Sequence, residues 1–349
     1  MKKTISILLL TGGICCAVNA QDNITEAAAA AAAALTEAPK EEVAEIQKPV
    51  YWDSSVDFEL GFNQTGLFSW AAGGYNTVTL GAGIDAKANY AKDLTSWNNR
   101  LQLQYGFLWS ADKLGLLQKS NDRIYLESKF AYKTSPNSNW NYAASLDFRT
   151  QFSDSYDNYV QVDDIWAGEL KSSFLSPAYL NLGLGLDWHP NSWFGLNIAP
   201  LTGGLVICTT TRSVDEYTGN EEGTGTSLRQ KYGMKLIDES IVSPTGKDYH
   251  SFLFQLGAQI KADLKFAIND KFTYESQLVL FTDYLNKPFV YNRVNWDNKI
   301  SWQAAKFFRV ALNTWLIYDP IVVIDDVASK VQFKEFFAIS FTYSISNKK

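Results

Sequence analysis

The sequence predicts an all-β protein, a transmembrane antiparallel β-barrel of twelve strands. Three observations predict it. From Tyr51 onward, apolar and polar residues alternate with a period of two, as they do in strands whose two faces meet different environments. The alternating segments run for roughly 10 to 15 residues, whereas soluble strands average about five or six and about 9–11 residues cross a bilayer. Charged residues make up only 19% of the 349 residues, which is less than a soluble surface usually carries.

The first twenty residues are predicted to be a signal peptide. Lys2 and Lys3 precede a mostly apolar run, and Val18-Asn19-Ala20 is typical of a cleavage site. Cys15 and Cys16 also allow a lipoprotein interpretation, which is weaker because Ile14 is a poor residue to precede a lipidated cysteine.

Cleavage after Ala20 leaves Cys208 as the single cysteine, so no intramolecular disulfide can form. It also removes two lysines and no acidic residue, which changes the formal charge from -6 to -8. A chain this acidic is not expected to bind nucleic acid.

Residues 21–50 are predicted to be a low-complexity, acidic tail. An eight-alanine run, Ala27–Ala34, is followed by a segment rich in glutamate. The tail has no aromatic residue and nothing to bury, so a periplasmic tether or spacer is expected. Binding of a periplasmic partner by this tail is the alternative.

The barrel is expected to occupy residues 51–349, and the strands follow in order from the alternation. They lie near residues 54–64, 76–90, 97–109, 122–133, 139–153, 178–189, 192–206, 250–267, 271–282, 289–303, 307–318 and 331–346. Their connections mostly alternate between short and long, as expected for short periplasmic turns and longer outer loops. A thirteenth candidate within 154–177 has the weakest period and would give an odd number, so it is left out.

Large aromatic rings flank each short turn. The pairs are Tyr90 and Trp97, Tyr132 and Trp140, Trp188 and Trp193, Phe266 and Phe272, and Trp302 and Phe307. Such rings favour the interface between lipid and water, so they predict a girdle at the periplasmic side. The N-terminal tail and the C-terminus are then expected in the periplasm.

The polar face of the strands supplies candidate residues for the barrel lumen. They are Asp85, Lys87, Arg100, Asp147, Arg149, Lys261, Asp263, Lys265, Arg293 and Asp297. Two interpretations stay open, a structural network of paired charges and a path for solutes. Gly183 and Gly185 are expected on the same face, where small residues leave space.

The long 207–249 loop is a second candidate site. It carries Arg212, Glu221, Glu222 and Arg229. Loops of this length are often functional. The loop is expected to fold into the lumen as a constriction, to bind a ligand outside the barrel, or to remain a solvated surface loop.

Several stretches resemble a known family. They are Ser69-Trp70-Ala71-Ala72-Gly73-Gly74, Ser96-Trp97-Asn98-Asn99, Phe148-Arg149-Thr150-Gln151-Phe152, Gly185-Leu186-Asp187-Trp188-His189-Pro190 and Ala199-Pro200-Leu201-Thr202-Gly203-Gly204. Their order is similar to that in Bacteroidota proteins grouped as a domain of unknown function, family 3078, over about residues 55–210. The resemblance implies an outer-membrane barrel and no assigned activity.

Catalysis is not expected. The two histidines, His189 and His250, fall at opposite ends of the expected barrel, and neighbouring residues such as His250 and Ser251 point to opposite faces of a strand. Neither histidine has a metal-ligand partner at a suitable spacing, so no metal or cofactor is expected.

Three functions are therefore compared. The leading hypothesis is a passive channel or transporter for small polar solutes in the outer membrane of a Gram-negative bacterium, in contact with its lipid. The alternative is a structural or partner-binding anchor, and an outer-membrane hydrolase is third.

Overall fold

The computed structural model describes residues 50–65, 77–162, 164–213, 226–285, 292–324, 327–328 and 331–347. The predicted signal peptide and nearly all of the predicted tail lie outside these ranges. Glu221 and Glu222 of the 207–249 loop also lie outside the described residues.

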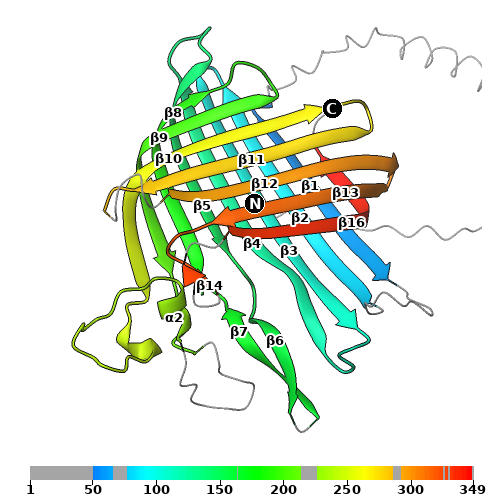
Figure 1. Ribbon diagram of the computed structural model, residues 1–349. Helices are drawn as coiled ribbons and strands as arrows, with labels where there is room; N and C mark the ends of the chain where they lie inside the picture. Colours follow the sequence, from blue (N-terminus) through cyan, green and yellow to red (C-terminus); the bar gives the residue numbers. More distant parts are fainter. Residues whose placement is uncertain are drawn as a thin grey trace, which may run out of the picture. The chain divides into compact units, whose positions relative to one another are not determined.

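Twelve antiparallel strands close into one barrel (Figure 1). They are β1 Trp52–Thr65, β2 Thr77–Lys92, β3 Thr95–Ser110, β4 Leu117–Lys133, β5 Trp140–Thr150, β8 Ala178–Trp188, β9 Phe194–Ile207, β10 Phe252–Ala267, β11 Phe272–Asp283, β12 Asn292–Ala305, β13 Phe308–Tyr318 and β16 Val331–Ser346. Around the barrel the order is β1, β16, β13, β12, β11, β10, β9, β8, β5, β4, β3 and β2. The predicted fold and the number of barrel strands are confirmed.

The first and last strands close the sheet. β1 and β16 pair from Ser55 opposite Ser346 to Phe62 opposite Ile339. At the end of this seam the Ser54 backbone N–H donates to Asn347 Oδ1 at 2.8 Å, and Asn347 Nδ2 donates to the Trp52 carbonyl at 3.0 Å. Closure pairs the two strand edges that an open sheet would leave without partners.

The two faces of the wall differ in polarity, as β10 illustrates. Phe252, Phe254 and Ile260 are exposed on the outer face, while Gln255 and Lys261 are buried on the inner face. The outer faces of the other strands add many large exposed apolar side chains. A contiguous apolar band of this kind is unfavourable in water and is typical of a surface that contacts lipid.

Aromatic rings contact one another at the end of the barrel that carries the short turns. Trp140 stacks on Trp188 with ring centroids 5.7 Å apart, and Phe272 stacks on Trp302 at 5.9 Å. Trp52, at the start of β1, contacts Trp97 at 5.9 Å. The aromatic residues predicted beside the short turns thus form cross-strand contacts at this end, which we call the turn end.

The opposite end, the loop end, carries additional structure (Figure 1). β6 Ser155–Val162 and β7 Ile165–Ser172 pair with each other in a separate sheet. The candidate strand within 154–177 therefore forms a hairpin outside the barrel, and leaving it out of the count was correct. The other loop-end elements are α2 Leu228–Lys231, η1 Gly246–Asp248, β14 Val323–Ile324 and β15 Val327–Ala328. Neither α2 nor η1, the helices of the described residues, has the length and hydropathy of a membrane-spanning helix.

The glycines of β8 do not leave the space that the sequence suggested. The register of β8 against β9 shifts between Leu184 and Leu186. At this bulge the backbone of β9 approaches Gly185 so closely that a Cβ atom would overlap the carbonyl oxygen of Ile198. A Cβ atom at Gly183 would lie 2.9 Å from Ser145 Oγ. These glycines permit close packing of strands and side chains instead.

A charge placed at mid-height on the outer face is expected to destabilise the barrel. Leu312 lies near the middle of β13 with its side chain exposed, whereas Val331 begins β16 at the loop end. We expect Leu312→Arg to lower the free energy of unfolding by about 2–4 kcal/mol and Val331→Arg by about 0–1 kcal/mol, because the cost depends on depth in the bilayer. Guanidinium titration in phospholipid vesicles measures both. Equal effects at the two positions would argue against a lipid-facing band.

Candidate functional site: the barrel lumen and the loop-end cap

The inner face of the barrel brings the predicted lumen residues together in separate groups. Asp85, Lys87 and Arg100 form one group on β2 and β3. The Asp85 carboxylate accepts from Arg100 Nε at 2.9 Å, from Arg100 Nη2 at 2.5 Å and from Gln102 Nε2 at 3.2 Å, and Lys87 Nζ lies 4.0 Å away. Cationic and amide donors thus surround this carboxylate, so the group is a structural network.

A second group bridges the lumen. Arg123 on β4 donates from Nη1 to Asp297 Oδ2 on β12 at 3.0 Å. β4 and β12 are six strands apart in either direction around the twelve-stranded barrel, so this ion pair joins opposite walls. Lys261 on β10 likewise donates from Nζ to Glu127 on β4. The lumen is therefore not an open pore, because paired side chains cross it.

Arginines and aromatic rings fill another part of the lumen. The guanidinium groups of Arg123 and Arg149 each lie 5.4 Å from the ring centroid of Trp315. Arg149 and Arg293 lie 5.0 Å and 5.6 Å from the ring of Tyr179. Cation–π contacts of this kind hold positive charge without a carboxylate. We call these five residues the arginine–aromatic ladder.

The remaining predicted lumen residues make local contacts. Lys265 pairs with Glu275 of the adjacent β11 at 2.8 Å. Asp263 accepts from Gln277 at 2.9 Å, and Asp147 accepts from Asn181 at 2.7 Å. Each contact joins neighbouring strands, so these residues stabilise the wall.

Four residues of the lumen were not predicted from the sequence: Arg123, Tyr179, Trp315 and Lys334. Trp315 is the residue that the sequence pattern could most readily have identified, because it lies on the polar face of its strand together with Arg309 and Asn313. A large ring on a polar face predicts an inner contact rather than a membrane contact. That its partners come from β4 and β5 could not be read from local alternation.

One wall of the lumen is lined by glycine and leaves space. Gly61 on β1 lies opposite Gly81 on β2, which lies opposite Gly106 on β3. A Cβ atom at Gly81 would have no neighbour closer than 3.8 Å, and one at Gly61 none closer than 3.9 Å. We call Gly61, Gly81 and Gly83 the glycine wall. Gly106 is not part of it, because a Cβ atom there would lie 2.8 Å from Ser120 Oγ.

A cavity of about 130 Å³ lies along this wall in the loop-end half of the barrel. A smaller cavity of about 40 Å³ continues toward the turn end, lined by Asp57, Arg309 and Thr342 among others. Both cavities are lined by Glu59, Gly83, Gln104 and Lys299. The two cavities therefore follow one another along the same wall.

The shared residues form the narrow point between the cavities. Lys299 Nζ on β12 lies 4.0 Å from Glu59 Oε2 on β1, at the limit of an ion pair. These side chains are about equally exposed, at 29% each. A loose, partly hydrated pair contributes little to stability and can separate at small cost.

The histidines belong to separate places. His189 Nε2 lies 2.6 Å from Asp187 Oδ2 in the turn that follows β8, and Lys129 Nζ lies 3.0 Å from the other oxygen of Asp187. His250 lies two residues before the start of β10 at the loop end, and its ring lies 6.4 Å from that of Phe252. Among the described residues, no cluster of three or more His, Cys, Asp or Glu residues is suited to a metal ion.

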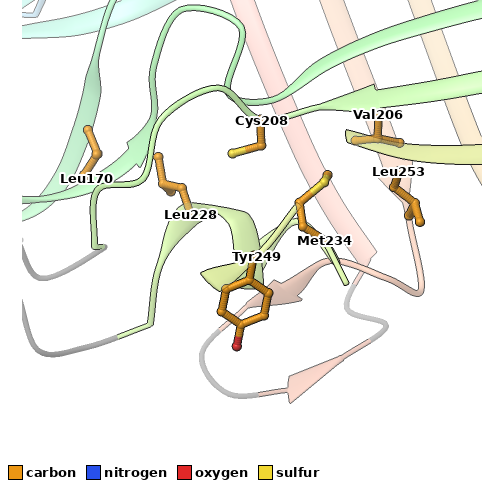
Figure 2. Packing of buried hydrophobic residues seen from close by; sticks show 7 residues of the cluster. All are labelled: Leu170, Val206, Cys208, Leu228, Met234, Tyr249 and Leu253. Atoms are coloured by element: carbon orange, nitrogen blue, oxygen red, sulfur yellow. The ribbon is translucent and has the colours of Figure 1, made fainter. Parts of the chain in front are cut away.

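The loop end is covered by a small hydrophobic core, which we call the cap. Its buried residues are Leu170, Val206, Cys208, Leu228, Met234, Tyr249 and Leu253 (Figure 2). They come from the β6–β7 hairpin, the 207–249 loop, β9 and β10. Val206 and Leu253 lie on the inner faces of their strands, where they are buried. The loop therefore packs against the lumen side of the β9–β10 mouth.

Two of the residues proposed for a loop constriction hold the cap together. Arg212 Nη1 donates to Asp154 Oδ2 at 2.6 Å, and its Nη2 lies 3.1 Å from the Tyr156 hydroxyl. Arg229 donates to the backbone carbonyls of Cys208 at 3.1 Å and Tyr249 at 2.8 Å. Neither arginine lines the two cavities.

The pairing with Arg212 makes the cap sensitive to acid. Burial raises the pKa of Asp154, but hydrogen bonds from Ser173 and Arg212 outweigh it and lower this pKa below its ordinary value. A lowered carboxyl pKa contributes stability at neutral pH, and that contribution is lost as the pH falls through the lowered pKa.

The family model described as "Protein of unknown function (DUF3078)" matches residues 62–156. This segment contains several of the motifs on which the resemblance was based. The comparison with curated proteins gives no match.

Several solved structures are similar over most of the chain. The translocator domain of the autotransporter NalP from Neisseria meningitidis is 10% identical, covers 91% of this chain and 97% of its own, and has a TM-score of 0.35. An outer-membrane channel from Pseudomonas putida F1 is 11% identical, with coverages of 86% and 96% and a TM-score of 0.32. The Pseudomonas putida toluene transporter TodX is 9% identical, with coverages of 86% and 90% and a TM-score of 0.30. Likeness at this level leaves the function to be argued from the lumen itself.

The buried thiol of Cys208 provides a test of the cap. Burial raises its pKa to about 11, so little thiolate is present at pH 8 and alkylation is expected to be slow. Leu228→Asp puts a charge into the cap core, where Leu228 is fully buried. We expect this change to accelerate iodoacetamide labelling of Cys208 by about tenfold or more.

The matched control is Leu114→Asp in a different loop, where the side chain is 69% exposed. Peptide mapping separates Cys208 from the other two cysteines of the chain. Rapid labelling of the unaltered protein, or equal rates in both variants, would contradict a closed cap.

Proposed function

We propose that this protein is an outer-membrane β-barrel that passes small polar solutes along the glycine wall. The observation that supports it is the pair of consecutive cavities, which share Glu59, Gly83, Gln104 and Lys299. The route runs beside the Arg123–Asp297 pair and Trp315, which line the larger cavity, whereas the Lys261–Glu127 pair lines neither cavity. Passage between the two cavities requires that the loose Glu59–Lys299 pair separate.

The membrane location is part of this proposal. The outer face of the barrel is apolar, and aromatic rings gather at the turn end. In bacterial barrels the short turns face the periplasm and the longer loops face outward. Since β1 begins and β16 ends at the turn end, the tail and the C-terminus are assigned to the periplasm of a Gram-negative cell.

The size of the route limits the solute. A cavity of about 150 Å³ accommodates one benzene molecule, and the larger cavity here is about 130 Å³. Its lining includes Asn63, Gln104 and Asn121 beside charged residues, so a polar solute replaces its hydration with hydrogen bonds to the wall.

The proposal assigns no catalytic activity. His189 is engaged by Asp187 in a turn, and His250 lies at the other end of the barrel. Neither lines the two cavities.

An anchoring role without transport is the second candidate. The Arg123–Asp297 and Lys261–Glu127 pairs and the ladder stabilise the barrel by joining its walls. A barrel stiffened in this way can hold the acidic tail at the membrane, where the tail binds a periplasmic partner.

Conductance with and without the loop separates the two candidates. We expect the chain that begins at residue 21 to show small, discrete currents in planar bilayers. Deletion of residues 212–239 removes Leu228 and Met234 from the cap, so a larger conductance is expected. Silence in both forms, with the barrels still folded, would favour the anchor.

The glycine wall can be tested by narrowing it. Gly81→Leu fills the larger cavity, while its Cβ fits without a clash. We expect conductance to fall by about half or more, with unchanged stability, because the added side chain occupies much of the free volume. Gly203→Leu is the matched control, since Gly203 lines an outer-face groove and its Cβ would be 4.0 Å from Phe254. Equal currents in the two variants would contradict a route along this wall.

A further inference from the structure

The charges around the larger cavity do not balance. Its lining includes three cationic side chains, Arg123, Lys299 and Lys334, and two acidic ones, Glu59 and Asp297. Arg123 pairs with Asp297, and Lys299 pairs with Glu59. Lys334 is the cation left over.

Lys334 has weak partners only. It lies near the loop end of β16, opposite Trp315 of β13, and both line the cavity. Its Nζ lies 3.4 Å from the Ser120 carbonyl and 3.5 Å from Asn121 Oδ1, both at the limit of a hydrogen bond. No acidic residue among those described forms an ion pair with it. Lys334 is exposed, so its ammonium group, which carries three donors, is accessible to a solute.

Arg123 adds positive charge to the lining of the same cavity. Its Nη1 is engaged by Asp297, but its buried Nε has no hydrogen-bond partner within the described structure. A buried donor without a partner costs free energy.

The surroundings extend the positive charge. Arg149 and Arg293 lie on the ladder beside Arg123, and aromatic rings rather than carboxylates hold Arg149. No carboxylate in the described ranges forms an ion pair with Arg149. This excess is local, because the whole chain carries a formal charge of -6. An electropositive pocket in an acidic protein concentrates anions at that point.

We propose that the larger cavity is a binding site for a small oxyanion, a carboxylate or a phosphate. Lys334 Nζ supplies the charged donor, the Arg123 guanidinium adds positive charge to the lining, and the glycine wall supplies the space. Oxyanions accept strong, charge-assisted hydrogen bonds from such groups. The inference deepens the proposed function, because it gives the solute route a preference for anions.

Equilibrium binding tests the site without requiring transport. The full chain in detergent micelles is titrated by calorimetry with phosphate or acetate at constant ionic strength, with chloride as the comparison. We expect saturable binding of at least one of the two oxyanions, and the tighter one identifies the class. Lys334→Gln is expected to weaken it by about tenfold or more, and Lys334→Arg is expected to retain it.

Lys265→Gln is the matched control. It removes a cation from the same face of the barrel, but Lys265 lies near the turn end, pairs with Glu275 and lines neither cavity. We expect binding to change by less than about twofold, because a distant exposed charge is screened. Equal losses in Lys334→Gln and Lys265→Gln, or oxyanion binding no tighter than that of chloride, would overturn the site.

Ion selectivity in bilayers then separates this inference from the proposed function. Currents that prefer anions, with a preference reduced in Lys334→Gln, support both. Oxyanion binding without current supports the site and removes the channel. Current with no oxyanion binding and an unchanged preference in Lys334→Gln overturns the site and leaves the channel standing.

Discussion

The closure of the sheet by β1 and β16 is the constraint on which the rest of the structure depends. Because the first and last strands pair, the apolar outer face can meet lipid without exposing an unpaired strand edge. Closure also creates an interior that twelve inner faces must fill. The seam is secured at the turn end, where Asn347 bonds to the backbone of both Ser54 and Trp52. The lumen, the cap and the cavities all follow from this closed wall.

The interior is filled unevenly, and this unevenness gives the molecule its candidate site. Large side chains cross the lumen from β4, β5, β8, β10, β12 and β13, and they meet as ion pairs or as arginines against rings. The β1–β3 wall instead places Gly61 opposite Gly81, so no side chain projects into the lumen at these two positions. The free space therefore lies against the glycine wall. It is lined there by Lys334, which forms no ion pair with any described carboxylate.

The sequence predicted the strands well because a wall between lipid and a polar interior imposes strict alternation. It also predicted that residues 154–177 add no strand to the barrel. The alternation weakens in this segment, and β6 and β7 pair there as a hairpin outside the barrel sheet. It assigned open space to Gly183 and Gly185, but a bulge brings the backbone of β9 onto Gly185. It proposed Arg212 and Arg229 as constriction residues, whereas they bind Asp154, Tyr156 and backbone carbonyls within the cap.

The sequence by itself determined the number of barrel strands, the residues that face inward and the turns that aromatic rings flank. Each of these follows from the alternation of apolar and polar residues and from the spacing of the turns, which can be read directly from the sequence. Only the tertiary structure decided which inward residues meet. Arg123 and Asp297 are 174 positions apart in sequence, and barrel closure alone brings them together. The register of Gly61, Gly81 and Gly106, and the weak contacts of Lys334, likewise depend on strand pairing and curvature, which no local pattern encodes.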